Sequence, residues 1–179
     1  MRLYRSRIEA IAQKVIKVLT EGEHIEVQPT SQLEAFADLE AVMVEYLKRE
    51  QRLRDAVREQ MASLRIPYSD YGKTRARIAR EWGHPMGSQI ERYLANQFVE
   101  SFFVSPYVEE VFSSDNALKR IIQETILEFD VDEGALRDEA REKIKNIPEN
   151  SSEYEIRFAQ ALREVRVRHG LVSERKDHR

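Results

Sequence analysis

The chain has 179 residues, of which 41% are hydrophobic and 34% are charged, with a net charge of −3 at neutral pH. This length allows one ordinary domain or two small ones, and the apolar fraction is sufficient to fill a core. Gly (6) and Pro (5) are scarce, which predicts a mainly helical protein whose helices have one apolar and one solvated face. The lack of cysteine excludes disulfides, thiolate zinc sites and cysteine nucleophiles.

The sequence shows neither a membrane-spanning segment nor a secretory signal. Its apolar runs are all shorter than the roughly 18 residues that a transmembrane helix needs, and Met1–Arg5 leads directly into an amphipathic pattern. We therefore expect a cytoplasmic protein with no membrane partner. Residues 1–87 carry 15 basic and 13 acidic side chains, and residues 88–179 carry 14 and 19. Neither half has the strongly basic balance of a dedicated nucleic-acid-binding protein.

The first half of the chain predicts four elements. Apolar side chains recur every three or four residues over 6–21, which predicts a helix. Residues 24–28 alternate polar and apolar, which predicts a short strand. Residues 31–64 contain neither Gly nor Pro and hold a nearly continuous apolar seam, so we expect one helix of roughly 50 Å. Pro67 ends that helix, and a shorter one is predicted over residues 71–82.

The second half repeats this order after a break at Gly83, Pro85 and Gly87. The successive elements predicted there are a helix over 88–102, a strand over 107–112, a long helix over 115–147 and a final helix over 154–165. The segment 130–134 should kink or break the long helix. Asp can cap a restarted helix, and Gly costs about 1 kcal/mol relative to Ala in a helix interior.

A repeated heptapeptide indicates that the chain is a tandem duplication. Leu53–Glu59 reads LRDAVRE, and Leu136–Glu142 in the second half reads LRDEARE. Continued without gaps to Gly87 and Gly170, this register gives 11 identities in 35 pairs, against about two expected by chance. We predict two homologous units related by pseudo-two-fold symmetry, with Leu53 and Leu136 equally buried. The expected boundaries are 1–87, 88–173 and a charged tail at 174–179.

Several segments resemble a bacterial family known only as domain of unknown function 507. They are the opening Met1-Arg2-Leu3, the helix ending in Arg141–Ile144, the turn Pro148–Tyr154 and the close His169-Gly170-Leu171. The resemblance implies a fold and a bacterial cytoplasmic setting, with one repeat corresponding to a usual member. It implies no catalytic residues. The first unit departs from the pattern, with Gly72 in place of Glu155 and Arg75 in place of Phe158.

Three basic residues form the first candidate site. Lys73, Arg77 and Arg80 share one face of a predicted helix and could contact phosphates as a small basic patch. The competing interpretation, an ordinary solvated face, is favoured because the segment is short and no aromatic stacking platform can be recognised beside it. The histidines lack the spacing of a zinc-binding helix, so neither a metal nor a cofactor is predicted.

Glu50 and Glu133 form the second candidate, because they occupy matching positions in the repeat and interrupt apolar seams. If two long helices crossed antiparallel at their midpoints, the two carboxylates would meet near the two-fold axis. They would then need Lys48, Arg52 or Arg137, a shared proton or a bound cation. The favoured alternative places both on the solvent side, paired with Arg54 and Arg137. Arg75 interrupts the apolar stripe of the helix predicted over 71–82. We expect its aliphatic stem on apolar surface and its guanidinium in water, with a buried ion pair as the alternative.

Because no phosphate loop, triad or metal spacing is present, the sequence favours a nonenzymatic protein–protein interaction or scaffold module. The second hypothesis is a weak nucleic-acid or ribonucleoprotein binder using the basic helix 73–80, and the third is an uncharacterised hydrolase. A large apolar groove would support a protein partner, and a basic stripe beside exposed Tyr or Trp would support nucleic acid. A pocket with clustered carboxylates would support an enzyme. The chain would be a monomeric pseudo-dimer or a homo-oligomer.

Overall fold

A computed structural model describes residues 1–149, 151 and 153–173. Within these residues the chain forms seven α-helices and one small antiparallel sheet, which confirms the predicted, mainly helical fold. The elements in chain order are α1 (Ile8–Glu21), β1 (Ile25–Val27), α2 (Gln32–Ser63), α3 (Tyr71–Glu81), α4 (Ile90–Phe102), β2 (Val108–Val111), α5 (Asp115–Leu127), α6 (Glu133–Lys143) and α7 (Tyr154–Arg168). The predicted tail 174–179 lies outside the described residues.

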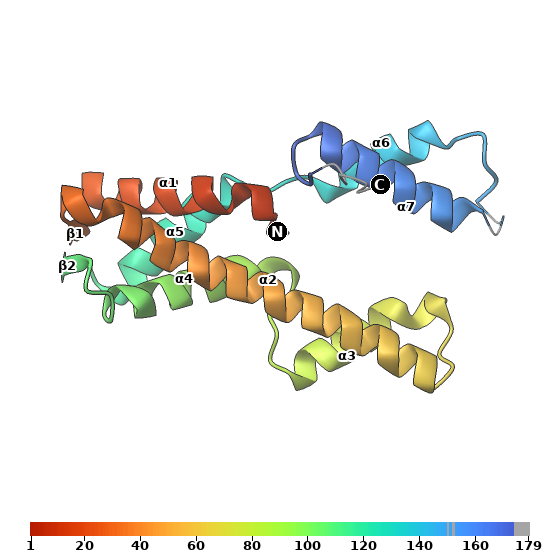
Figure 1. Cartoon of the computed structure of the whole chain (residues 1–179), viewed down its shortest axis with the longest axis horizontal. Coiled ribbons are helices and arrows are strands. Elements are labelled where there is room, and N and C mark those ends of the chain that lie inside the picture. The colour runs from red at the N-terminus through yellow and green to blue at the C-terminus, as the bar shows by residue number, and fades with distance from the viewer. Residues whose placement is uncertain (150, 152, 174–179) are drawn as a thin grey trace, which may run out of the picture.

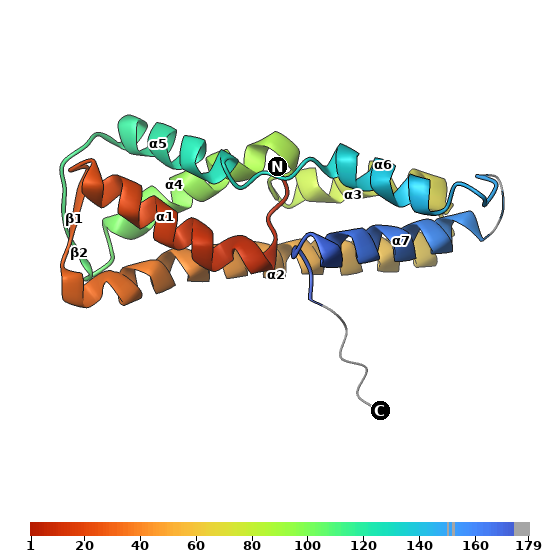
Figure 2. The ribbon, with the colours of Figure 1, turned by 90° about the horizontal axis from the view of Figure 1, so that it is seen from above.

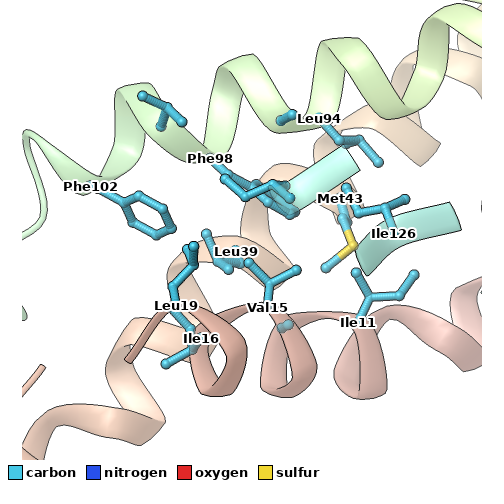
Figure 3. Close-up of a cluster of buried hydrophobic side chains, with 14 of the residues drawn as sticks. Ile11, Val15, Ile16, Leu19, Leu39, Met43, Leu94, Phe98, Phe102 and Ile126 are labelled. Carbon is cyan, nitrogen blue, oxygen red and sulfur yellow. The ribbon is translucent and has the colours of Figure 1, made fainter. Parts of the chain in front are cut away.

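The larger part of the molecule, which we call the body, consists of α1, the first half of α2, α4 and α5 (Figure 1). Figure 3 shows side chains from all four helices meeting in its core, including Val15 of α1, Met43 of α2, Phe98 of α4 and Ile126 of α5. Each of these four side chains has no exposed surface. Burial of such apolar side chains stabilises the body by about 1.5 to 3 kcal/mol each.

The two predicted strands lie side by side and close one end of the body. β1 and β2 pair antiparallel, with Ile25 opposite Val111 and Val27 opposite Val108. The register shifts after Glu26. Both strand predictions are therefore confirmed. The two strands are separated in the sequence by about the same distance as the two copies of the repeated heptapeptide.

Two slender arms extend from the opposite end of the body (Figure 1). The first arm is the second half of α2 with α3, and the second arm is α6 with α7. Each arm has its own small core, and the repeated leucines lie in these cores. Leu53 in the first arm has no exposed surface and Leu136 in the second is 3% exposed, as predicted. Figure 2 shows the body and both arms aligned along one long axis.

The expected break in the second long helix is confirmed, whereas α2 runs without interruption. α5 ends at Leu127 and α6 begins at Glu133. Asp132 caps the restart, because its carboxylate accepts a hydrogen bond from the backbone N–H of Ala135 at 3.0 Å. The break lets the chain leave the body and enter the second arm as a separate helix.

The N-terminus belongs structurally to the second arm as well as to the body. Leu3 packs into the body core, whereas Tyr4 is buried in the core of the second arm beside Leu136 and Val165. The Ser6 hydroxyl donates to the carbonyl of Leu171 at 3.2 Å. Residues 1–6 therefore pass between the body and the second arm. Along the described part of the chain, every helix is too short or too polar to cross a bilayer.

Candidate functional site

The surface between the two arms is hollowed into a cleft. Its middle section, about 610 Å³, is lined from the first arm by Arg54, Arg58, Tyr68 and Tyr71 and from the second arm by Arg166. An outer section of about 580 Å³ joins Tyr68 to residues of the second arm such as Arg141, Tyr154 and Phe158. We call these two sections, together with the cavity described next, the inter-arm cleft.

A basal cavity of about 360 Å³ lies where the arms meet the body. The N-terminus, both arms and the body all contribute to it. Its wall consists of Met1, Arg2, Leu3, Tyr46, Leu47, Glu50, Arg54, Tyr71, Arg75, Gly87, Ile90 and Arg137. Arg2, Arg54 and Tyr71 also line the middle section, so the cavity and the cleft share one wall.

The inter-arm cleft is strongly basic in a chain whose net charge is −3. Its arginines are Arg2, Arg54, Arg58, Arg75, Arg137, Arg141 and Arg166. The acidic residues in the same walls are Glu50, Glu149 and Glu155. The Nε of Arg166 is buried and has no hydrogen-bond partner within the described residues. Arg58, Arg141 and Arg166 pair with Asp55, Asp138 and Glu133, which lie outside these walls. Because each guanidinium has five N–H donors, the cleft still offers an anion donors that these carboxylates do not occupy.

Aromatic rings lie beside these guanidinium groups. Tyr68 is 68% exposed and stacks on Tyr71 with the ring centroids 5.7 Å apart. On the second arm, Tyr154 stacks on Phe158 at 6.1 Å, and the guanidinium of Arg141 lies 5.8 Å from the centre of the Phe158 ring. The cleft thus combines positive charge with one exposed ring, Tyr68, on the first arm and with the half-buried rings of Tyr154 and Phe158 on the second.

Glu50 is the centre of an ion network that fixes α3 to α2. Its side chain is buried, and its two oxygens accept hydrogen bonds from Nη2 of Arg75 at 2.8 and 3.0 Å. Nε of Arg54 donates at 3.0 Å, and Nε2 of His84 lies 3.0 Å from Oε2. The His84 ring stacks on Tyr46 at 5.1 Å. The alternative prediction for Arg75, a buried ion pair, is therefore confirmed. The guanidinium of Arg75 binds the carboxylate of Glu50 and does not simply extend into water.

This environment changes the acidity of Glu50. Burial by itself would raise the pKa of the carboxyl group, because it disfavours the charged form. The hydrogen bond from His84 and the positive charges of Arg75 and Arg54 outweigh burial and lower the pKa to about 2. Glu50 is thus ionised throughout the physiological range, which makes it unsuitable as a general acid.

Glu133 forms a corresponding centre in the second arm with different partners. It accepts a hydrogen bond from the Tyr4 hydroxyl and another from Nη2 of Arg166 at 2.6 Å, while Arg2 lies 3.8 Å away. Burial would raise the pKa of Glu133, but the Tyr4 hydrogen bond and Arg166 lower it. The carboxylate therefore fixes the N-terminus and α7 to the start of α6.

The structure lacks the crossing of two continuous long helices that was assumed for an axial Glu50–Glu133 pair. Glu133 is the first residue of α6, so two continuous helices do not cross at these positions. Each carboxylate has its own set of partners, which are Arg54, Arg75 and His84 in one case and Tyr4, Arg166 and Arg2 in the other. The alternative prediction placed Glu50 on the solvent side, paired with Arg54. The contact with Arg54 is confirmed, but the solvent position is wrong, because Glu50 is only 7% exposed.

The three basic residues proposed as a patch lie on the exposed surface of α3. Lys73 pairs with Asp70 at 3.1 Å, and Arg77 pairs with Glu81 at 2.8 Å. Arg80 is exposed as well. None of the three belongs to the walls of the inter-arm cleft as defined above. The structure therefore separates this patch from the larger group of arginines.

Sequence reasoning missed the inter-arm cleft because its walls come from distant parts of the chain. Arg75 is the one signal in the sequence, since it interrupts an apolar stripe, whereas His84 shows no pattern that indicates a contact with Glu50. In the described residues, His, Asp and Glu side chains do not gather into a group of three or more that could hold a metal ion.

Comparison with known proteins places the chain in a family without adding an activity. Residues 1–171 match a family described as "Protein of unknown function (DUF507)". The match runs through both of the units predicted from the repeat. No curated protein matches the chain.

Proposed function

The chain belongs to the DUF507 family, and from the geometry of its site we propose that it is a nonenzymatic protein that binds single-stranded nucleic acid between its two arms. One observation carries this proposal. Arginines from both arms and the exposed Tyr68 of the first arm line one continuous cleft, in which Arg54, Arg58 and Arg166 lie near this ring. The proposed surface thus differs from the basic helix 73–80.

A nucleic-acid strand offers the cleft two kinds of chemical group, its phosphates and its bases. Guanidinium groups bind phosphates through charge-assisted hydrogen bonds, and binding releases counterions from the strand. Unpaired bases stack on aromatic rings, with about 1 to 3 kcal/mol per base lost when such a ring is removed. Tyr68, at 68% exposure, is available for stacking without rearrangement. A base pair hides these faces inside a duplex, so a single strand suits this cleft better.

We further infer that the two arms are counterparts in a duplicated chain with a pseudo-two-fold axis. α2 begins at Gln32 and α5 at Asp115, while α3 begins at Tyr71 and α7 at Tyr154. Both pairs of helix starts have the same sequence offset as Leu53 and Leu136 in the repeated heptapeptide. A two-fold axis through the sheet would also pair β1 with β2 antiparallel. Under this proposal, the cleft is the space between two diverged copies of one arm.

The test is a fluorescence-anisotropy titration of labelled single-stranded RNA and DNA, with duplexes of the same sequence for comparison. We expect single strands to bind more tightly than duplexes. The logarithm of the binding constant should fall linearly with the logarithm of the salt concentration, with a slope of about 0.7 per phosphate contacted. Tyr68→Ala should weaken binding about tenfold or more, because it removes a stacking surface. Phe103→Ala is the matched control, since Phe103 is 60% exposed but lies at the end of α4 in the body.

A charge-matched pair of variants separates the cleft from the helix 73–80. Arg58 lines the cleft and is 68% exposed, whereas Arg80 is exposed on α3 and does not line the cleft. Arg58→Gln should weaken binding several-fold and reduce the salt slope, while Arg80→Gln should leave both unchanged. A larger effect from Arg80→Gln would favour the helix 73–80 instead. If neither single-stranded RNA nor DNA binds at low salt, the proposed function is wrong.

A separate observation favours a protein partner as a second candidate function. Leu33, Phe103, Val104 and Phe112 are 55 to 82% exposed. They lie at the start of α2, at and just after the end of α4, and just after β2, all at the sheet end of the body. Exposed apolar side chains of this kind are typical of protein-binding surfaces. If a protein partner binds these apolar side chains, Val104→Asp in the full chain should abolish binding of that partner while leaving nucleic-acid binding unchanged.

A further inference from the structure

The basal cavity has the composition of a phosphate site. Arg2 comes from the N-terminus, Arg54 and Arg75 from the first arm and Arg137 from the second arm. Glu50 is the carboxylate in the same wall. Four guanidinium groups and one carboxylate thus line a volume of about 360 Å³, and Glu133, outside this lining, lies 3.8 Å from Arg2.

The hydrogen-bond donors in this wall exceed the acceptors available to them. Each guanidinium carries five N–H donors. Arg54 and Arg75 share the two oxygens of Glu50, which His84 also contacts. Arg2 lies 3.8 Å from Glu133, too far for a direct hydrogen bond. Arg137 is exposed and forms no ion pair with any described residue.

The positive charges in this region also oppose one another. Burial lowers the pKa of Arg2, and the charges of Arg166 and Arg54 lower it further, although Tyr4 and Glu133 act in the opposite direction. A guanidinium in such surroundings is stabilised by any anion that approaches it. A dianion would gain more than a monoanion, because the attraction grows with its charge.

We propose that the basal cavity binds a phosphate monoester or diphosphate group, held by Arg2, Arg54, Arg75 and Arg137. In the full complex this group is the terminal phosphate of the strand lying in the inter-arm cleft, a step that rests on the proposed function. A terminal phosphate monoester carries about 1.5 to 2 negative charges at neutral pH, compared with one for an internal phosphodiester. The body side chains Tyr46, Leu47 and Ile90 bound the cavity, so it provides an end wall for the strand.

The ligand would connect the two arms. Arg75 belongs to α3 of the first arm, and Arg137 belongs to α6 of the second. A phosphate group bound by both residues fixes the spacing between the arms. Hydrogen exchange in α3 and α6 should therefore slow on binding, whereas exchange in the body core should not change.

The first experiment is isothermal titration calorimetry of the full chain with pyrophosphate, which tests the cavity without any nucleic acid. We expect one site per chain. Arg137→Gln should weaken binding at least tenfold, because a charged donor to the phosphate is lost. Arg80→Gln, which makes the same charge change on the outer surface of α3, should alter affinity less than twofold. Absence of pyrophosphate binding, or equal losses in the two variants, would overturn the inference.

The second experiment identifies the source of the phosphate group. Single-stranded oligonucleotides with a 5′-phosphate, a 3′-phosphate or only hydroxyl ends are compared by anisotropy. A preference of about tenfold for one phosphorylated end, lost in Arg137→Gln, supports a terminal phosphate in the cavity. Equal affinities for all three refute it. Pyrophosphate binding without oligonucleotide binding would refute the proposed function while supporting the cavity as a site for a small phosphate compound.

Discussion

Replacement of Glu50 by Gln tests whether the buried ion network holds the first arm together. The pKa of Glu50 falls from 4.5 to about 2 on folding. Each pKa unit corresponds to about 1.4 kcal/mol, so the network stabilises the folded chain by about 3 kcal/mol at neutral pH. The carboxylate side chain is 10% exposed, so solvent screens these interactions little. Because the amide retains one hydrogen-bond acceptor, Glu50→Gln should cost about 2 to 3 kcal/mol.

The pH dependence of this loss follows from the direction of the shift. The pKa is lower in the folded chain, so the stabilisation is fully present above the unfolded value of 4.5 and is lost as pH falls toward 2. The difference between wild type and Glu50→Gln should therefore shrink by about 1 kcal/mol between neutral pH and about pH 3.5. Urea unfolding at both pH values measures the difference. Trp82, the only tryptophan, follows α3 and reports the first arm by fluorescence.

The matched control is Glu45→Gln, which removes an exposed carboxylate from the same helix. Glu45 is 50% exposed and pairs with Lys48 and Arg52 at the surface. Such pairs contribute about 0 to 1 kcal/mol, so this variant should lose less than about 0.5 kcal/mol. If Glu50→Gln loses no more than the control, or if its loss does not depend on pH, the network does not stabilise the arm as argued.

Three further predictions concern the arms. Leu53→Ala and Leu136→Ala should each cost about 2 to 5 kcal/mol in chemical denaturation, because both side chains are buried; losses under about 1 kcal/mol would contradict the core assignment. Residues 71–82 should exchange amide hydrogens faster than residues 154–165, since the first-arm core is smaller, and equal or slower exchange would refute this. Asp132→Ala should cost about 0.5 to 2 kcal/mol by removing the cap of α6, whereas Asp130→Ala, which caps no helix, should cost less.

The sequence by itself determined the helices and strands and placed most of their starts to within two residues, although α6 ends at Lys143 rather than at 147 and α7 continues to Arg168 rather than ending at 165. The 3.6-residue periodicity predicted α2 as one helix, and the pattern around residues 130–134 predicted the break before α6. The burial of Leu53 and Leu136 followed from the same periodicity. These features depend on residues within about one or two helical turns of each other, so a single sequence contains the information they need.

Only the tertiary structure decided how charged residues are paired and where the arginines meet. Arg75 and Glu50 lie 25 residues apart, and Tyr4 reaches Glu133 across 129 residues. The sequence shows an arginine interrupting an apolar stripe, but whether its guanidinium meets water or a carboxylate depends on the helix opposite. The inter-arm cleft likewise exists because α6 leaves the body at the break after α5 and brings Arg137 and Arg166 toward the arginines of α2. Local periodicity fixes each helix face, whereas contacts between faces depend on how the helices pack.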